Sequence, residues 1–97
     1  MAKVVLSAAA QLDVIDAVDW YELQAPGLGG RLIAEIGAAI ARVGSNPRQY
    51  PLVHRTLRRV LVRRFPYALF YRSSGDAVEV IACLHTSRDS RQWRARA

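Results

Sequence analysis

The stretch RRVLVRRFPYALFYRSSGDAVEVIACLHTSRDSRQW, residues Arg58–Trp93, decides the fold of this chain. Its β-branched and aromatic residues predict three consecutive strands, at about Leu57–Phe65, Tyr67–Ser73 and Val78–His85. The polar turn Ser73–Asp76 joins the last two strands as a hairpin. Because arginines stand among the apolar residues, the sheet is expected to bury one face and to offer the other to an anionic partner.

The preceding residues predict one strand and two helices. Lys3–Leu6 is a short apolar run, and Ser7 stands where the N-cap of a helix belongs. Apolar residues then recur at helical spacing over Ala8–Gln24 and over Leu28–Val43. The resulting order, β-α-α-β-β-β, predicts an α+β fold in which a helical hairpin packs on a small twisted antiparallel sheet.

Two further details of the helices are expected. Gly37 and the alanines around it should let the first helix approach the second. The first helix also carries acidic residues every three positions, and these should form a solvated stripe because side chains splayed along one helix do not converge on a substrate. The stripe consists of Asp13, Asp16, Asp19 and Glu22.

Length and composition indicate one domain, 1–97, with a single core. No apolar run approaches the roughly 20 residues of a membrane span, and no signal peptide is expected. The one cysteine, Cys83, lies in an apolar strand and leaves no partner for a disulfide. A reducing, cytoplasmic location is therefore predicted.

Charge is distributed unevenly along the chain. Residues 1–47 hold three basic and five acidic side chains, a net charge of −2. Residues 48–97 hold eleven basic and three acidic side chains, a net charge of +8. All eleven basic residues of the second half are arginines. Since guanidinium groups stay charged and bind phosphate or carboxylate in a fork, this half is expected to bind an anionic partner.

Cofactor and metal chemistry are not indicated, because His54, His85 and Cys83 have no recognised ligand spacing. The histidines are the natural proton-transfer groups, and arginines can supply cations for a phosphate. His85 is either such a group or a hydrogen-bonded residue that fixes the tail. Trp93 is interpreted as a core aromatic residue that caps the sheet. Arg72 and Arg88 leave two interpretations open: exposed contacts to a target, or internal pairs, Arg72 with Asp76 and Arg88 with Asp89 or Glu79.

A series of short motifs resembles the RelE/ParE superfamily of type II toxin–antitoxin toxins over nearly the whole chain. The motifs are Trp20–Tyr21 in the first helix, P-R-x-Y-P at Pro47–Pro51, the arginine-bearing strand Arg58–Arg64, F-P-Y-x-x-x-Y-R at Phe65–Arg72 and L-H-x-x-R-D-x-x-x-W at Leu84–Trp93. The closing motif resembles the ParE, or plasmid-stabilisation, branch.

The resemblance implies a growth-arresting toxin that binds DNA gyrase, needs no cofactor, and is neutralised by a cognate antitoxin with which it forms a hetero-oligomer. The alternative is a RelE-like ribosome-dependent mRNA endonuclease, and a third reading is a member that binds only its antitoxin. RelE-like nucleases often carry lysines on these strands and a tyrosine in the tail, whereas this chain has only Lys3 and no tail tyrosine.

The candidate residues fall into three sets. For target binding they are Arg63, Arg72, His85, Arg88 and Arg91. For antitoxin binding they are Leu12, Trp20, Ile36, Ile40 and Arg59. If the chain is a ribonuclease, they are His85, Arg58, Arg64, Arg72 and Arg88.

Overall fold

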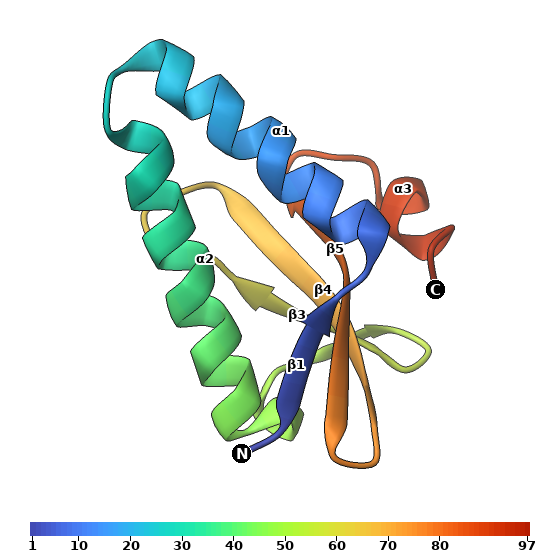
Figure 1. Cartoon of the computed structure of the whole chain (residues 1–97). Coiled ribbons are helices and arrows are strands. Elements are labelled where there is room, and N and C mark those ends of the chain that lie inside the picture. Colours follow the sequence, from blue (N-terminus) through green and yellow to red (C-terminus); the bar gives the residue numbers. More distant parts are fainter.

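The computed structural model describes all 97 residues, and it confirms the predicted α+β fold (Figure 1). The elements, in chain order, are β1 (Lys3–Leu6), α1 (Ala8–Gln24), α2 (Leu28–Ser45), the short 3-10 helix η1 (Pro47–Gln49), β2 (Leu52–His54), β3 (Leu57–Leu61), β4 (Tyr67–Ser74), β5 (Ala77–His85) and α3 (Ser90–Arg94). Helices α1 and α2 form a hairpin over one face of the sheet (Figure 1). Helix α3 lies near the N-terminal end of α1, away from the turn that joins α1 to α2. None of the helices is long and apolar enough to cross a membrane.

The sheet has the strand order β1-β5-β4-β3-β2 and is mixed. The pairs β3–β4 and β4–β5 are antiparallel as expected, and the unpredicted strand β2 pairs antiparallel with β3. In contrast, β1 runs parallel to β5, with Lys3 opposite Ala77 and Leu6 opposite Val80. β1 pairs with the last strand of the sheet and not with the next strand along the chain, so its direction is not set by a hairpin turn. β1 and β2 are therefore the two edge strands.

Two strand boundaries also differ from the expectation. The first predicted strand ends at Leu61, not at Phe65, because Arg64 takes a left-handed φ of 67° and Pro66 follows at the bend. The segment expected as a connector before Leu57 contains the strand β2, whose three residues are too few to show a period.

The helical hairpin is closed by Glu22 and by glycine. Gly27 takes a left-handed φ of 88°, and the Glu22 carboxylate accepts hydrogen bonds from the backbone N–H groups of Gly27 and Gly29. A Cβ at Gly29 would lie 2.9 Å from the carbonyl oxygen of Val18, so the helices meet here. A Cβ at Gly37 would meet nothing within 4 Å, so the expectation of close approach at that glycine was wrong.

Both faces of the sheet are covered by apolar packing. The larger cluster lies between the sheet and the helices and contains Leu32, Val43, Leu69 and Tyr71 among its buried members. The smaller cluster lies on the opposite face and joins Leu57, Ala68, Phe70, Ile81, Ala82 and Leu84 to Trp93 of α3. The second face is thus not an open arginine surface, because the tail after β5 covers part of it.

Burial of two ionisable groups should make the fold sensitive to alkali. Burial raises the pKa of the Cys83 thiol and that of the Tyr71 hydroxyl to about 12 each. In the unfolded chain these groups ionise near their ordinary values of 9.0 and 10.0, so the unfolded state loses protons first and stability falls as the pH rises from about 9 towards 12. Urea unfolding should show this loss between pH 8 and pH 11, and Tyr71→Phe should lose less stability across the interval than the wild-type chain. An equal loss in both would contradict the account.

Candidate functional site

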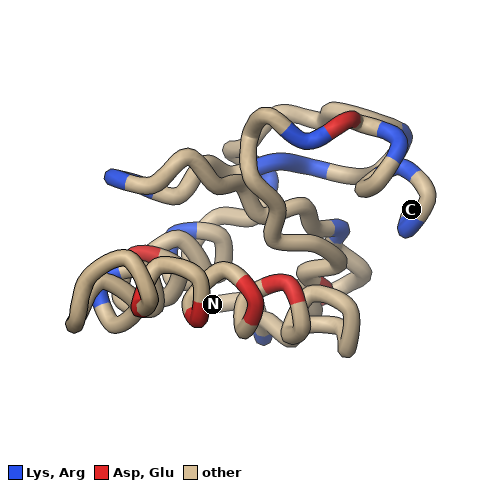
Figure 2. The backbone as a smooth tube through the Cα atoms, turned by 90° about the horizontal axis from the view of Figure 1, so that it is seen from above, with Lys and Arg blue, Asp and Glu red and all other residues tan.

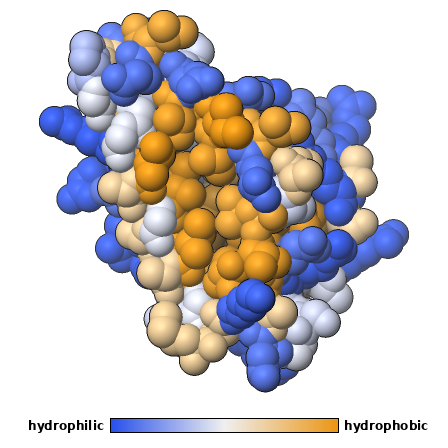
Figure 3. Space-filling view, viewed as in Figure 1, coloured by the Kyte–Doolittle hydropathy of each residue, from blue (hydrophilic) through white to orange (hydrophobic).

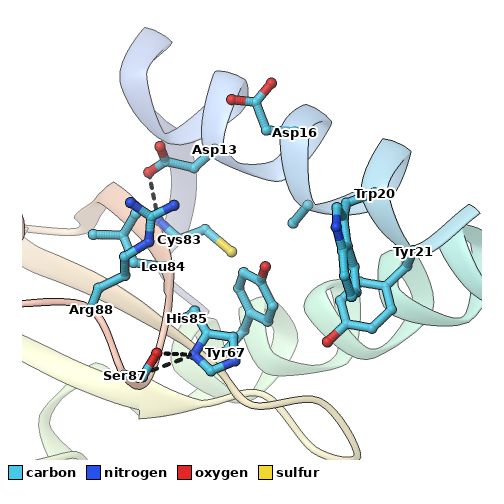
Figure 4. Close-up of a pocket in the computed structure, with 11 residues that line it drawn as sticks. Asp13, Asp16, Trp20, Tyr21, Tyr67, Cys83, Leu84, His85, Ser87 and Arg88 are labelled. Carbon is cyan, nitrogen blue, oxygen red and sulfur yellow. Dashed lines mark hydrogen bonds between the residues drawn. The ribbon is translucent and has the colours of Figure 1, made fainter. Parts of the chain in front are cut away.

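A cavity of about 500 Å³ opens between α1 and the end of β5 (Figure 4). One side of α1 lines it with Asp13, Asp16 and Trp20, which are spaced by three and four residues and therefore lie along one face of the helix. His85 ends β5 at the opposite wall, and Arg88 lies in the segment between β5 and α3. Its volume is within the roughly 300–1,000 Å³ that is usual for ligand sites.

His85 is held at the cavity wall by Ser87. The backbone N–H of Ser87 donates to Nδ1 of His85 at 3.0 Å, and the Ser87 hydroxyl lies 2.8 Å from the same nitrogen. Since a backbone N–H can only donate, Nδ1 is the acceptor and the neutral ring carries its hydrogen on Nε2. The ring also packs edge-on against Tyr67, with centroids 5.4 Å apart. His85 is therefore hydrogen-bonded at one nitrogen and keeps the other as a donor.

Tyr67 and Arg88 add two more donors. The Tyr67 hydroxyl points towards Cys83 and α1 in Figure 4, and burial raises the pKa of this hydroxyl, with Tyr21 adding to the effect and Arg88 opposing it. Arg88 is exposed and donates only to the side-chain oxygen of Gln92, at 3.3 Å. Of the two interpretations left open for Arg88, the internal pair with Asp89 or Glu79 does not form, because Asp89 pairs with Arg91 and Glu79 pairs with Arg72.

Asp13 is a structural anchor and departs from the expected solvated stripe. Its carboxylate accepts the backbone N–H of Cys83 at 3.0 Å and pairs with Arg96 at 2.5 Å, while Arg96 also donates to the carbonyl of Ile81. The Asp13 side chain is only 13% exposed. Helix α1, strand β5 and the end of the chain are thereby joined at one point.

The arginines of the ribonuclease set are held apart from one another. Arg58 donates to the carbonyls of Arg48 and Tyr50, at 3.2 and 2.6 Å. Arg64 pairs with Glu35 of α2, and Arg72 pairs with Glu79 at 3.0 Å across the β4–β5 hairpin. Of the two interpretations left open for Arg72, the internal pair is found, but its partner is Glu79 and not Asp76. Of the whole set, only His85 and Arg88 line the same cavity.

Most of the target-binding candidates lie on the strands of the sheet or in the tail after β5, and not on the helical hairpin. Figure 2 shows basic residues along the sheet layer and tail, while five of the eight acidic residues belong to α1 and α2. Arg63 is exposed and forms no ion pair, whereas Arg91 is bound to Asp89 at 2.8 Å and lowers the pKa of that carboxyl. Arg63 and Arg88 are thus the candidates that no carboxylate neutralises.

The antitoxin-binding candidates do not share one surface. Leu12 and Trp20 are 61% and 54% exposed on α1. Ile36, in contrast, is 4% exposed in the main core, so the expectation that it is a contact residue was wrong, and Ile40 is only partly exposed. Arg59 pairs in register with Phe70, a member of the smaller cluster, and so projects from the face opposite the helices.

A continuous apolar surface does exist on the helical side. Figure 3 shows apolar side chains gathered between α1, α2 and β1. Several apolar residues of these three elements are only partly covered by the core, namely Val4, Leu6, Val14, Val18 and Ile40. We call these five residues the hairpin groove. The sequence pattern did not separate them from core residues, because one helical face contains both.

The sequence model of the ParE toxin of type II toxin–antitoxin systems (parDE) matches residues 4–90. This chain belongs to the ParE toxin family. A search of curated proteins found no match. Among solved structures, the chromosomal ParDE toxin–antitoxin system from P. aeruginosa is similar, with a TM-score of 0.77 and 16% identity over 88% of this chain and 96% of that chain. That likeness supports the ParE-type fold, and the family match over residues 4–90 includes every residue that lines the cavity.

Proposed function

We propose that this ParE-family chain arrests growth by binding DNA gyrase in the cytoplasm, without chemistry of its own. The observation that carries the proposal is the dispersal of its arginines. A ribonuclease needs several cations on one phosphate, but Arg58, Arg64 and Arg72 are each engaged with a different part of the chain. Among the target-binding candidates, Arg63 and Arg88 remain exposed without an ion pair, which suits binding to a large partner better than cleavage.

We further propose that a cognate antitoxin neutralises the toxin by lying in the hairpin groove. Its toxin-binding segment would be amphipathic, placing apolar side chains on Val4, Val18 and Ile40. The groove lies beside β1, an edge strand, so backbone groups of an extended segment can also pair there. The complex is a hetero-oligomer of toxin and antitoxin.

The second candidate function is mRNA cleavage on the ribosome, and one observation favours it. His85, Arg88 and Tyr67 line the same cavity, which gives one proton-transfer group and one cation. In that mechanism His85 would be essential, whereas in gyrase binding it is one contact among several.

Pulse-labelling of a bacterial host separates the two functions. After induction without antitoxin, gyrase binding predicts that DNA synthesis stops first, with a DNA-damage response, and that His85→Ala lowers toxicity by less than about tenfold because only a surface contact is lost. Early loss of protein synthesis, abolished by His85→Ala, would establish the nuclease instead. Unimpaired growth with a folded protein would leave only antitoxin binding.

A further inference from the structure

Arg88 brings to the cavity between α1 and the end of β5 a positive charge that forms no ion pair, although Asp13 and Asp16 line the same cavity. Every carboxylate near Arg88 is engaged elsewhere or lies out of reach: Asp89 pairs with Arg91, and Asp13 pairs with Arg96. Asp16 lines the cavity but forms no ion pair, and Figure 4 shows it farther along α1, while the side chain of Arg88 extends from the tail towards Asp13. The guanidinium of Arg88 therefore faces the cavity with only the neutral Gln92 as a partner.

Two neutral donors face the same space. The Tyr67 hydroxyl donates to no acceptor within the chain, and it resists ionisation because burial raises its pKa. His85 has Nδ1 occupied by Ser87, which leaves its Nε2–H for a ligand. The Arg88 guanidinium, the Tyr67 hydroxyl and the Nε2–H of His85 can therefore all donate hydrogen bonds to one small anion in the cavity.

The rest of the cavity restricts the kind of anion. Ala17, Trp20 and Leu84 provide apolar walls, which suit the aliphatic stem of a side chain. Asp16 and Asp19, both exposed on α1, would repel a chain that carries a charge on every unit at several points, whereas a single carboxylate at Arg88 meets repulsion mainly from Asp16, the unpaired carboxylate of the cavity wall. Tyr21 already packs edge-to-face with Trp20 and Phe65, with centroids 4.9 and 5.0 Å apart, so its ring is not free to stack on a base. These features favour a single carboxylate on a polypeptide over a nucleic-acid backbone.

We propose that this cavity is an anchor site for one acidic side chain of the antitoxin, whose carboxylate binds Arg88, Tyr67 and His85. The inference rests on the proposed function and adds a specific contact to it. Since Arg88 and His85 are also candidates for target binding, the same carboxylate blocks the target surface directly. Neutralisation is then competition for Arg88, in addition to coverage of the hairpin groove.

The test uses the antitoxin that restores growth when it is co-expressed with this chain, labelled with a fluorophore for anisotropy titration. Arg88→Met keeps the length of the side chain and removes its charge, and we expect it to weaken binding by about 10- to 100-fold. Tyr67→Phe removes only the hydroxyl and should weaken binding by about 5- to 10-fold. Arg55→Met, an exposed arginine of the β2–β3 turn, is the charge-matched control and should change affinity by less than about twofold.

A double-mutant cycle identifies the carboxylate. Each Asp and Glu of the antitoxin is replaced by Asn or Gln, and one such change should lose its effect when it is combined with Arg88→Met. If Arg88→Met and Tyr67→Phe bind the antitoxin as tightly as the wild type, the anchor site is wrong while the proposed function stands. If no protein restores growth or binds, the antitoxin proposal itself fails. A short labelled single-stranded RNA that binds in an Arg88-dependent way, with antitoxin binding unchanged, would also overturn the inference.

Discussion

Trp93→Ala should lower the free energy of unfolding by about 3–5 kcal/mol, the usual cost of removing a large buried aromatic side chain. Trp93 is 8% exposed and stacks on Phe70 with ring centroids 4.6 Å apart and an angle of 15° between the planes. It is the residue through which α3 covers the smaller apolar cluster. For a chain of this size, the loss corresponds to a fall of more than about 10 °C in the melting temperature.

Calorimetry or thermal circular dichroism measures this effect. Leu23→Ala is the matched control, because Leu23 is apolar but 85% exposed, and it should change stability by less than about 0.5 kcal/mol. If Trp93→Ala has the same melting temperature as the wild type, packing of the tail on the sheet does not contribute to stability, and the account of a core on both faces of the sheet is wrong.

Asp13→Ala should have the second largest effect and lower the free energy of unfolding by about 2–4 kcal/mol. It leaves the Cys83 N–H without its acceptor and the Arg96 guanidinium without its partner, and a donor that loses its partner in the interior costs more than the bond contributed. Arg96→Met should cost less, because Arg96 is 30% exposed and Asp13 keeps its bond from Cys83.

Urea unfolding checks the prediction for Asp13, with Asp16→Ala as the control one helical turn away. Asp16 is exposed and unpaired, so its removal should be nearly neutral. Equal stabilities of the Asp13 and Asp16 variants would show that the contact between α1, β5 and the tail does not contribute to the fold.

The order of the elements could be predicted from the sequence because each carries its own periodic signal. The N-cap at Ser7 is confirmed, since its side-chain oxygen accepts the backbone N–H of Ala10. The parallel pairing of β1 could not be predicted, because a four-residue strand does not specify its partner. The short strand β2 was missed for a similar reason.

The candidate site was less predictable, since it depends on contacts between distant residues. Asp13 and Arg96 are 83 positions apart, so the sequence assigned Asp13 to a solvated stripe. The spacing of Asp13, Asp16 and Trp20 did place them on one helical face, but nothing in the sequence indicated that this face meets His85 and Tyr67. The engagement of Arg58, Arg64 and Arg72 likewise depends on the folded structure.

Negative supercoiling of relaxed plasmid DNA by purified gyrase tests the central claim most directly. The account predicts that the purified, folded toxin stops supercoiling at near-stoichiometric amounts, and that preincubation with antitoxin restores it. Full supercoiling in the presence of excess folded toxin, together with cleavage of ribosome-bound mRNA by the same preparation, would contradict it.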